Sequence, residues 1–416
     1  MTETARRQAA FVFVFITVLL DMLALGMTVP VLPRIVLQFV GDDQVRAAQV
    51  YGLFSTVWAA MQFLFSPVQG ALSDRFGRRA VILASNFGLG LDYVLMAVAP
   101  SLTLLFVGRV ISGITAASIS TANAYIADVT PPEKRASAFG MLGVAFGVGF
   151  ILGPALGGLL GAVDPRLPFW VAAGFSLLNG LYGLVILPES LPRDRRARFV
   201  LANANPIGSL RLLRSHRELF GLAAVTLLDY FAHASLPTIT VLYMSYRYGW
   251  DERMVGITMA IIGLCTMIVQ GVLVGPFVRH FGERVALFAG FAFGVAGFAM
   301  FGLAPTGLWF WAGVPVLSLW GLAGAALPAL MSQRVAPTEQ GQLQGASASL
   351  MGIASMLGPS LFTLSYAAAI DPQRGYHLPG APFLLAAAFL LAALTVGWRV
   401  TRAGRERPGP ARAGRG

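Results

Sequence analysis

Long apolar segments recur along this chain, and short segments that carry most of the charged residues separate them. A run of about twenty apolar residues is long enough to cross a bilayer as a helix. We find twelve such runs and predict one transmembrane helix for each. The predicted spans cover residues 9–33, 47–69, 80–100, 102–126, 136–160, 168–187, 218–240, 254–276, 285–304, 308–331, 341–367 and 380–399.

A polar, arginine-rich segment divides the twelve spans into two sets of six. We predict a six-helix N-terminal half over residues 1–187, a cytoplasmic linker over 188–217, a six-helix C-terminal half over 218–399 and a basic cytoplasmic tail over 400–416. Parallel six-helix repeats of this kind occur in secondary transporters. The predicted fold class is an all-α polytopic membrane protein with two pseudo-symmetric halves.

Composition supports the same class. Of the 416 residues, 56% are hydrophobic and 12% are charged, whereas soluble domains carry about 25% charged residues. The single Cys265 excludes an internal disulfide, and the four histidines are too scattered to predict a metal site. The chain has no recognisable Ser/His/Asp set or phosphate-binding loop. We therefore expect no catalytic residues, no metal and no bound cofactor, which argues against a membrane enzyme or sensor.

The net charge of +11 is distributed unevenly between the two sides of the predicted membrane. If the N-terminus lies inside, 23 of the 30 Lys and Arg residues fall in inner segments. This asymmetry follows the positive-inside rule and places both termini in the cytoplasm. The basic charge therefore indicates the lipid bilayer as partner and not nucleic acid.

Residues 70–79, GALSDRFGRR, form a charged segment between spans two and three. Four of its residues recur 205 positions later, as Gly275, Phe281, Gly282 and Arg284, and the same offset relates pairs in other regions. A fixed offset through several regions indicates duplication. We predict a gating role, in which loop arginines pair with an acid at the end of span four; the alternative is a basic loop that only anchors topology. The predicted gating residues are Gly70, Asp74, Arg75, Gly77, Arg78, Arg79 and Asp128.

Small residues recur at helical spacing in spans five and eleven, including Gly140, Gly143 and Gly147. Such stripes permit close helix packing, and Gly-Pro pairs also permit a bend. Both interpretations can hold together. The predicted helix-bend motif comprises Gly149, Gly153, Pro154, Gly157, Gly158, Gly358 and Pro359.

Four ionisable residues lie well inside the spans, namely Asp21, Asp92, Asp229 and Arg109. A charge at mid-bilayer costs about 2.5–3.5 kcal/mol even on lenient scales, so such residues usually line a cavity or pair with one another. One interpretation is a structural ion pair with Arg109. The other is proton coupling, because a carboxyl group that alternates between desolvated and water-exposed sites can bind and release a proton.

Thr28, Ser120 and Asn123 share helical faces with these ionisable residues, which indicates a substrate cavity. Gln62 and Gln270 are further polar candidates for substrate contact. For Gln270, in span eight, a hydrogen bond between helices is an equal alternative. The predicted cavity residues are Thr28, Gln62, Ser120, Asn123 and Gln270.

Several motifs carry a resemblance to one family. The segment GALSDRFGRR resembles the signature loop of the major facilitator superfamily, and residues 147–158 look like the fifth-helix motif of its antiporter branch, which is associated with drug export. Gly108-Arg109 followed by Gly113 resembles its fourth-helix arginine motif, with Ser112 where a glutamine is usual. Other segments are similar to the bacterial tetracycline efflux antiporters: Leu20-Asp21, Pro30–Pro33, Ala124–Asp128 and Gln340–Gly345.

The resemblance implies a multi-pass protein of the bacterial inner membrane, expected to act as a monomer. It implies export of a small amphipathic drug or metabolite in exchange for protons. The tetracycline exporters carry a histidine where this chain has Thr266 and an acid where it has Gly294, so the substrate stays open between tetracycline and another compound. The alternative is a major facilitator with other coupling that imports or equilibrates a small metabolite.

Overall fold

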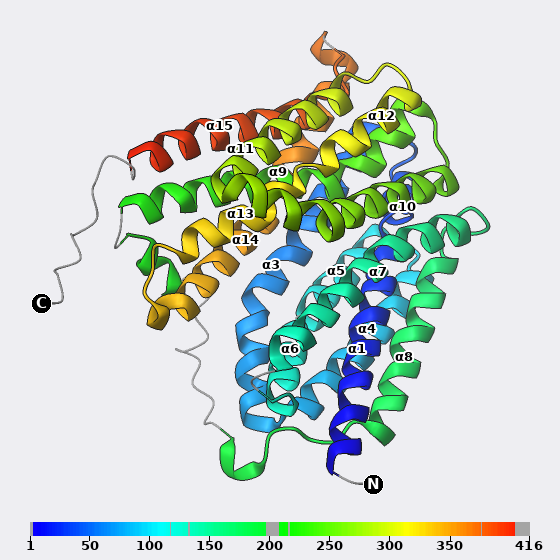
Figure 1. The fold of residues 1–416 in the computed structure, drawn as a ribbon. Helices are drawn as coiled ribbons and strands as arrows, with labels where there is room; N and C mark the ends of the chain where they lie inside the picture. Colours follow the sequence, from blue (N-terminus) through cyan, green and yellow to red (C-terminus); the bar gives the residue numbers. More distant parts are fainter. Residues whose placement is uncertain are drawn as a thin grey trace, which may run out of the picture. The chain divides into compact units, whose positions relative to one another are not determined.

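The computed structural model describes residues 3–403 except 117, 132–133, 197–207, 215–216 and 376. These residues form helices joined by short turns, and no β-strand occurs among them (Figure 1). The predicted tail lies almost wholly outside the described residues, as does the middle of the predicted linker. The all-α polytopic class predicted from the sequence is confirmed.

Eight α-helices precede the linker: α1 (Glu3–Thr28), α2 (Leu32–Phe39), α3 (Gln44–Phe76), α4 (Arg78–Val98), α5 (Leu102–Thr115), α6 (Ser118–Val129), α7 (Arg135–Gly161) and α8 (Leu167–Ile186). Seven follow it: α9 (Arg217–Tyr248), α10 (Glu252–Ile268), α11 (Val274–Leu303), α12 (Gly307–Ser318), α13 (Gly321–Ser332), α14 (Gln340–Ile370) and α15 (Ala381–Ala403). The short helices are η2 (Arg193–Arg195), η4 (Gly208–Arg214), the π-helical η5 (Val269–Leu273), η6 (Pro337–Glu339) and η7 (Pro372–Arg374).

Each of the twelve predicted spans lies mostly on helix. In the described part of the chain, nine helical segments are long and apolar enough to cross a membrane. One of them, Glu252–Leu303, covers two predicted spans, and the spans on α3 and on α5 with α6 lie outside these nine. A multi-pass membrane protein follows, with a helix count consistent with twelve.

Two helix ends differ from the predicted boundaries. We expected a loop over residues 70–79, but α3 continues to Phe76 and α4 begins at Arg78. Gly77 alone makes the turn, because its φ of 104° lies in a region that side chains disfavour. The helix of span one ends earlier than predicted, at Thr28, because Pro30 interrupts it, and Pro33 lies in the first turn of the next helix, α2.

The duplication inferred from the sequence is visible in the backbone. Gly77 and Gly282, which are 205 residues apart, both have positive φ, at 104° and 81°. Spans four and ten are each broken near the middle, between Thr115 and Ser118 and between Ser318 and Gly321. The same unusual features therefore occur at equivalent places in the two repeats.

The chain divides into two compact units that do not coincide with the predicted halves. Unit 1 comprises Met1–Pro206, Ser235–Leu264 and Ser355–Pro382, and unit 2 comprises Ile207–Ala234, Cys265–Ala354 and Phe383–Gly416. Consequently α9, α10 and α14 each contribute residues to both units, as does α15 through its first two residues. The halves over 1–187 and 218–399 stay a prediction.

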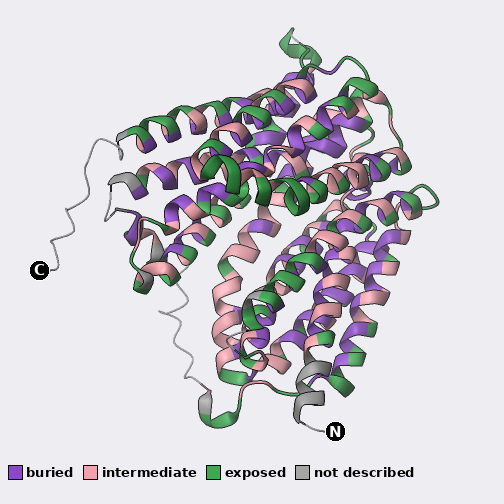
Figure 2. Cartoon of the chain, viewed as in Figure 1, coloured by how far each residue is buried: buried purple, intermediate pink, exposed green. Residues whose placement is uncertain are grey.

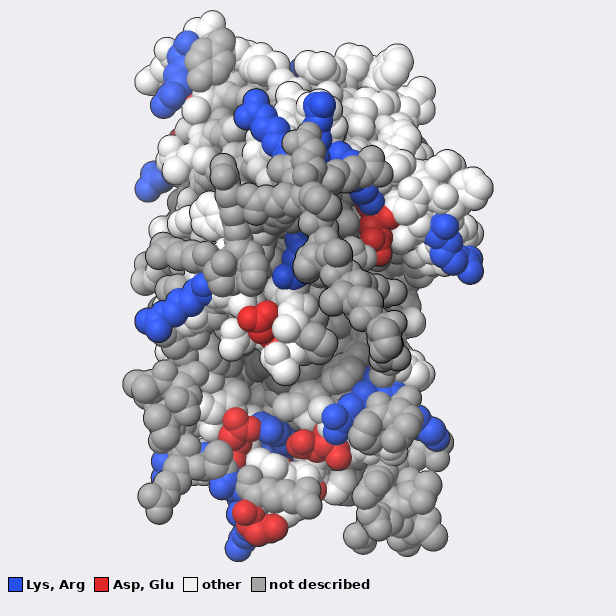
Figure 3. All heavy atoms as spheres, turned by 60° about the vertical axis from the view of Figure 1, so that its left-hand side comes forward, with Lys and Arg blue, Asp and Glu red and all other residues white. Residues whose placement is uncertain are grey.

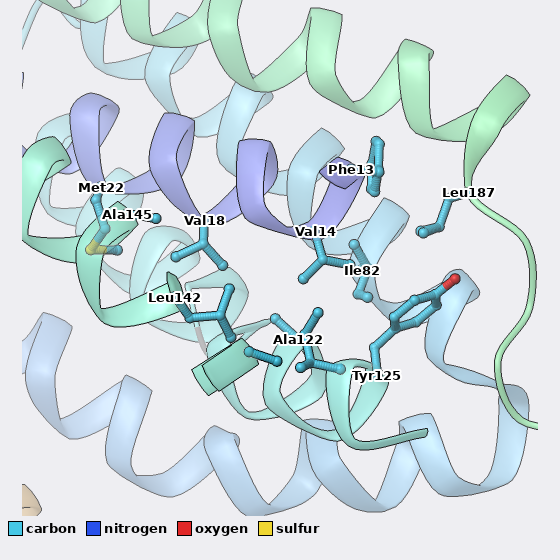
Figure 4. Packing of buried hydrophobic residues seen from close by; sticks show 12 residues of the cluster. Phe13, Val14, Val18, Met22, Ile82, Ala122, Tyr125, Leu142, Ala145 and Leu187 are labelled. Atoms are coloured by element: carbon cyan, nitrogen blue, oxygen red, sulfur yellow. The ribbon is translucent and has the colours of Figure 1, made fainter. Parts of the chain in front are cut away.

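In unit 1, α1 lies between α7 and α8 and makes extensive contacts with both. Figure 4 shows its buried side chains packed against those of α4, α6 and α7. Within a bilayer such packing stabilises through close contact between helices, because lipid is as apolar as the side chains. The core residues drawn there include Phe13, Val18, Ile82, Tyr125 and Leu142.

The outward face of α8 is apolar and exposed. Leu178, Leu181, Leu184 and Val185 are between 47% and 82% exposed, and exposed positions recur along the helices of unit 1 (Figure 2). Exposed aliphatic side chains on a helix of this length are typical of a lipid-facing surface.

Candidate functional site

A small cavity in unit 1 contains two of the predicted site residues. Asp21 of α1 and Gln62 of α3 both line it, and its volume is about 30 Å³. That volume holds about one or two water molecules. The other lining residues come from α1, α3, α4, α5 and the turn after α5; they are Met22, Leu25, Trp58, Leu89, Tyr93, Ser112 and Ala116.

Asp92 and Arg109 are buried close to this cavity. Asp92 of α4 is 2% exposed, and neither of its carboxyl oxygens has a hydrogen-bond partner among the described residues. Gly108 of α5 leaves room for this carboxyl group, since a Cβ atom there would lie 2.9 Å from Oδ1. The Cζ atom of Arg109 lies 5.3 Å from the centroid of the Trp58 ring, a distance at which a cation and an aromatic face attract.

The buried charges of unit 1 do not form the structural ion pair considered above. None of the salt bridges between described residues includes Asp21, Asp92 or Arg109. A buried carboxyl group without a cationic partner is costly in a membrane protein. Arg109 and Asp92 still interact electrostatically without a salt bridge, so the functional interpretation of these acids stays a prediction.

The break in span four lies beside the cavity. Where α5 ends, the carbonyl groups of Ile114 and Thr115 accept hydrogen bonds from the side chains of Gln69 on α3 and Ser85 on α4. Side chains of neighbouring helices thus satisfy carbonyl groups that a continuous helix would bond internally. Interrupted helices at equivalent places in two repeats mark the substrate and ion sites of many transporters.

In unit 2, Asp229 of α9 lies beside the break in span ten. The indole Nε1 of Trp320 donates a hydrogen bond to Oδ1 of Asp229 at 2.9 Å, and the His233 ring centroid lies 5.0 Å from that of Trp320. Gly294 packs against the same ring: a Cβ atom there would lie 2.5 Å from Cδ1 of Leu390 and 3.1 Å from Cγ of Trp320. A side chain at position 294 would therefore have to displace Leu390 and would crowd the ring that binds Asp229.

The remaining predicted cavity residues are not brought to the cavity of unit 1. Thr28 is buried, and its hydroxyl donates to the carbonyl of Leu25 at 2.8 Å. Asn123 on α6 and Gln270 in η5 are exposed. Ser120 lies on α6, but its side chain is outside the described residues.

The charged loop is held within unit 1 by Arg78. Its guanidinium is 2.5 Å from Asp74, 3.4 Å from Asp128 and 2.6 Å from the hydroxyl of Ser73. The predicted pairing with Asp128 is therefore made by Arg78. Arg79 instead donates to the carbonyl of Leu184 at 2.7 Å.

The other predicted gating residues have no bond to Asp128. Arg75 is exposed and lies over the ring of Phe76, and Gly70, inside α3, has no described atom within 4 Å of its Cβ position. Gly77 makes the turn between α3 and α4.

Glu189 is a loop partner that the sequence analysis missed. Its Oε1 accepts a hydrogen bond at 2.9 Å from the backbone N–H of Arg78, which is the first residue of α4. A carboxylate at a helix N-terminus binds unpaired N–H groups and is favoured by the helix dipole. Glu189 also fills the space beside Gly77, where a Cβ atom would collide with it. The acid directly after the end of span six was the available sequence signal.

The glycines of the predicted helix-bend motif pack α7 against α1 and α10. A Cβ atom at Gly149 or Gly157 would collide with Met22 or Met27, and one at Gly153 would lie 2.7 Å from Cα of Gly26. Gly158 similarly contacts the backbone of α10. Pro154 lies inside α7, and Gly358 and Pro359 are buried inside α14.

The glycines earlier in the same stripe do not contact another helix in this way. No described atom lies within 4 Å of the Cβ position of Gly140, Gly143 or Gly147. Within unit 1, close packing therefore involves the later glycines of the stripe and not these three.

Unit 1 also joins segments of the two predicted halves. Arg34 of α2 is 2.6 Å from Glu252 of α10, whose side chain is 8% exposed. The hydroxyl groups of Thr56 on α3 and Ser360 on α14 are 2.8 Å apart. By the predicted topology these contacts lie toward the outer side of the membrane.

Comparison with known proteins identifies the chain's relatives. The sequence profile of the Major Facilitator Superfamily matches residues 14–359. The class C tetracycline resistance protein of Escherichia coli is 38% identical over 369 residues, which cover 88% of this chain and 92% of that protein. The class B protein of the same species is 34% identical, over 84% of this chain and 86% of that protein.

Solved structures share the fold. The human organic anion transporter MFSD10 superposes with a TM-score of 0.69 at 24% identity, over 94% of this chain and 99% of that one. The nucleoside transporter NupG, as a D323A mutant, superposes with a TM-score of 0.77 at 13% identity, with the same coverage. These similarities concern the fold alone. The resemblance inferred from the sequence motifs is confirmed.

Proposed function

This chain belongs to the major facilitator superfamily, and we propose that it exports a small amphipathic compound in exchange for protons. It is a multi-pass membrane transporter and not an enzyme. The observation that carries the proposal is the pair of buried carboxyl groups, Asp21 and Asp92, that no cation neutralises within salt-bridge distance among the described residues.

Asp21 supplies the point at which substrate and proton compete. It shares a cavity with an amide, an indole, a phenol and a hydroxyl group, from Gln62, Trp58, Tyr93 and Ser112. Such a lining offers apolar surface with a few polar groups, as small-molecule sites do. A drug-sized ligand needs about 300–1,000 Å³. The cavity of about 30 Å³ must therefore widen before substrate binds.

Asp92 and Arg109 supply the coupling. The guanidinium of Arg109 favours the ionised carboxyl group when the two approach, and separation or loss of water favours the protonated one. A conformational change that alters their surroundings would let Asp92 load a proton on one side and release it on the other. Asp229 is a third candidate carrier, held by Trp320 in the second repeat.

The contacts of unit 1 support alternating access. The Arg34–Glu252 pair and the Thr56–Ser360 contact link helices of different repeats, so they must break if the repeats separate on that side. By the predicted topology, the charged loop that contains Arg78 lies at the other, cytoplasmic end of the spans. Bistable contacts at the two ends allow one side to open while the other stays closed.

The remaining parts of the proposal, on localisation, topology and oligomeric state, rest on the sequence. We propose that the chain lies in the bacterial inner membrane with both termini in the cytoplasm, because its inner segments hold most of the arginines. We propose that it acts as a monomer and that the proton is its coupling ion. The substrate class is amphipathic drugs or metabolites, with tetracycline as one candidate.

The test is drug susceptibility of a pump-deficient bacterium that expresses the chain, over a broad panel that includes tetracyclines. Expression should raise the inhibitory concentration of at least one amphipathic compound, and Asp21→Asn should remove the protection at equal membrane abundance. Export is contradicted if cells that express the wild type accumulate more of the panel compounds than control cells do.

A further inference from the structure

A second and larger cavity lies at the end of α8 in unit 1. Its volume is about 600 Å³, within the range of ligand sites. Residues of α4, of the end of α8 and of the segment that follows α8 line it. It contains none of the residues of the cavity around Asp21, so the proposed transport mechanism does not account for it.

The polar side of this cavity carries an excess of positive charge. Arg79, Arg193 and Arg196 line it, and Glu189 is its only acid among the described residues. Glu189 is already engaged by the backbone of Arg78 and, at 3.5 Å, by Arg196. Nε of Arg79 is buried and has no hydrogen-bond partner among the described residues. The cavity therefore offers more donor groups than its own acid can satisfy.

Charged side chains gather at this end of unit 1. Figure 3 shows Arg and Lys together with Asp and Glu at the bottom of the view. The charged residues of the cavity lie near the start of α4 and after the end of α8.

The other side of the cavity is apolar and continuous with the lipid-facing surface. Leu83 and Leu184 line it, from α4 and α8. Leu184 is 47% exposed, and its neighbour Val185 is 82% exposed. A ligand in this cavity would therefore meet guanidinium groups at one end and the hydrocarbon surface of the bilayer at the other.

We propose that this cavity binds the headgroup of an anionic phospholipid, with Arg193 and Arg196 on the phosphate and the acyl chains along α8. A guanidinium group matches the geometry of a phosphate through paired N–H donors. Basic pockets at the cytoplasmic ends of transmembrane helices are suited to anionic lipid. The apolar wall distinguishes a lipid from a free phosphate ion, which would gain nothing from Leu83 and Leu184.

A ligand in this cavity would also contact residues that hold the charged loop. Arg79 bonds the end of α8, and Glu189 bonds the start of α4, so a bound headgroup would touch both connections. The inference does not depend on which compound is transported.

The test uses the purified full chain in detergent and native mass spectrometry with phosphatidylglycerol and phosphatidylcholine of matched acyl chains. The wild type should retain phosphatidylglycerol about tenfold in preference to phosphatidylcholine. Arg193→Gln/Arg196→Gln should abolish that preference, and Arg193→Lys/Arg196→Lys should keep most of it. The matched control is Lys134→Gln/Arg211→Gln, which removes two exposed charges outside the cavity and should keep the preference.

The ratio between the two lipids is the measured quantity, because a misfolded variant would lose both alike. Equal retention of the two lipids by the wild type would overturn the proposal. So would an equal loss of preference in the control pair, which would indicate non-specific attraction. Displacement of phosphatidylglycerol by tens of millimolar inorganic phosphate would assign the cavity to a free anion and would also overturn it.

Discussion

At the scale of single residues, Asp21 and Asp92 differ in their surroundings. Asp21 opens onto a cavity that holds about one or two water molecules, whereas Asp92 is 2% exposed and faces Gly108. Widening of that cavity, which substrate binding also requires, would bring Asp21 into contact with water. Asp92 needs a movement of α4 or α5 to meet water, which suits a group whose protonation follows the conformation.

Substitution of either acid should separate coupling from permeation. Asp21→Asn and Asp92→Asn should each abolish uphill export in proteoliposomes, because the amide cannot carry a proton, while downhill equilibration of substrate survives. The matched control is Asp194→Asn, an exposed acid after α8. If both variants drive substrate uphill at the wild-type rate, neither acid is the carrier and Asp229 becomes the next candidate.

The sequence alone predicted the charged members of the site and one neutral lining residue, but not the aromatic part of the lining. Asp21 and Gln62 stand out as polar residues in apolar spans, and the structure places both in one cavity. Trp58 and Tyr93 carry no such signal, since aromatic residues are common in membrane helices. The interaction of Asp229 with Trp320 depends on a contact between distant helices, which no local pattern reveals.

At the scale of elements, the packing of α7 on α1 depends on glycine backbones. Gly153→Ala should lower the thermal unfolding midpoint of the detergent-solubilised protein, because the added methyl group lies 2.7 Å from Cα of Gly26. Overpacking of this kind costs about 1–3 kcal/mol. Alanine is favoured over glycine by at most about 1 kcal/mol in helix propensity, so the steric cost of the methyl group exceeds this gain.

Gly147→Ala is the matched control on the same helix. No described atom lies within 4 Å of its Cβ position, so only the gain in propensity remains and the midpoint should stay equal or rise. Equal midpoints for the two variants would contradict the proposed role of Gly153 in packing.

The turn between α3 and α4 should act in transport more than in stability. Asp74 is 47% exposed in its pair with Arg78, and exposed pairs contribute about 0–1 kcal/mol. Asp74→Asn should therefore leave membrane abundance and the unfolding midpoint nearly unchanged but reduce transport severely. Transport assays at matched abundance decide this, and a fully active variant would reduce the loop to a topology anchor.

Sequence periodicity located the helices but not all of their ends. Residues 70–76 were expected in a loop because they are charged, yet one glycine at position 77 is enough to turn the chain. The break after Thr115 has no proline to predict it, and Gly113 just before it is one of many glycines in these spans. Hydrogen bonds from Gln69 and Ser85 support that break, and these form only after three helices have assembled.

At the scale of the whole molecule, composition and duplication predicted a polytopic membrane protein built from two repeats, and the sequence motifs then indicated the family. Twelve apolar runs and the positive-inside asymmetry follow from the physical requirements of a membrane, and the offset of 205 residues indicates duplication. The substrate does not follow from them. Its recognition depends on a few side chains in a cavity, and at Thr266 and Gly294 this chain departs from the tetracycline exporters.

The contact between Arg34 and Glu252 should hold the outer side closed. Glu252→Gln removes an ion pair worth about 1 kcal/mol, which corresponds to about a fivefold shift toward the open form. A membrane-impermeant maleimide should label Thr56→Cys about fivefold faster in this variant, measured in a Cys265→Ser background.

Asp251→Asn is the neighbouring control for this measurement. Asp251 accepts a hydrogen bond from the N–H of Met254 at the start of α10, and asparagine caps a helix equally well. Labelling that is as fast in Asp251→Asn as in Glu252→Gln would show that the ion pair does not hold the outer side closed.

The most direct test of proton-coupled export is substrate accumulation by the wild-type chain in proteoliposomes under an imposed pH gradient. The proposal predicts that substrate accumulates against its own gradient, that protons move in the opposite direction, and that an ionophore that collapses the pH gradient stops both. Accumulation that persists at full rate after the gradient has collapsed would contradict it.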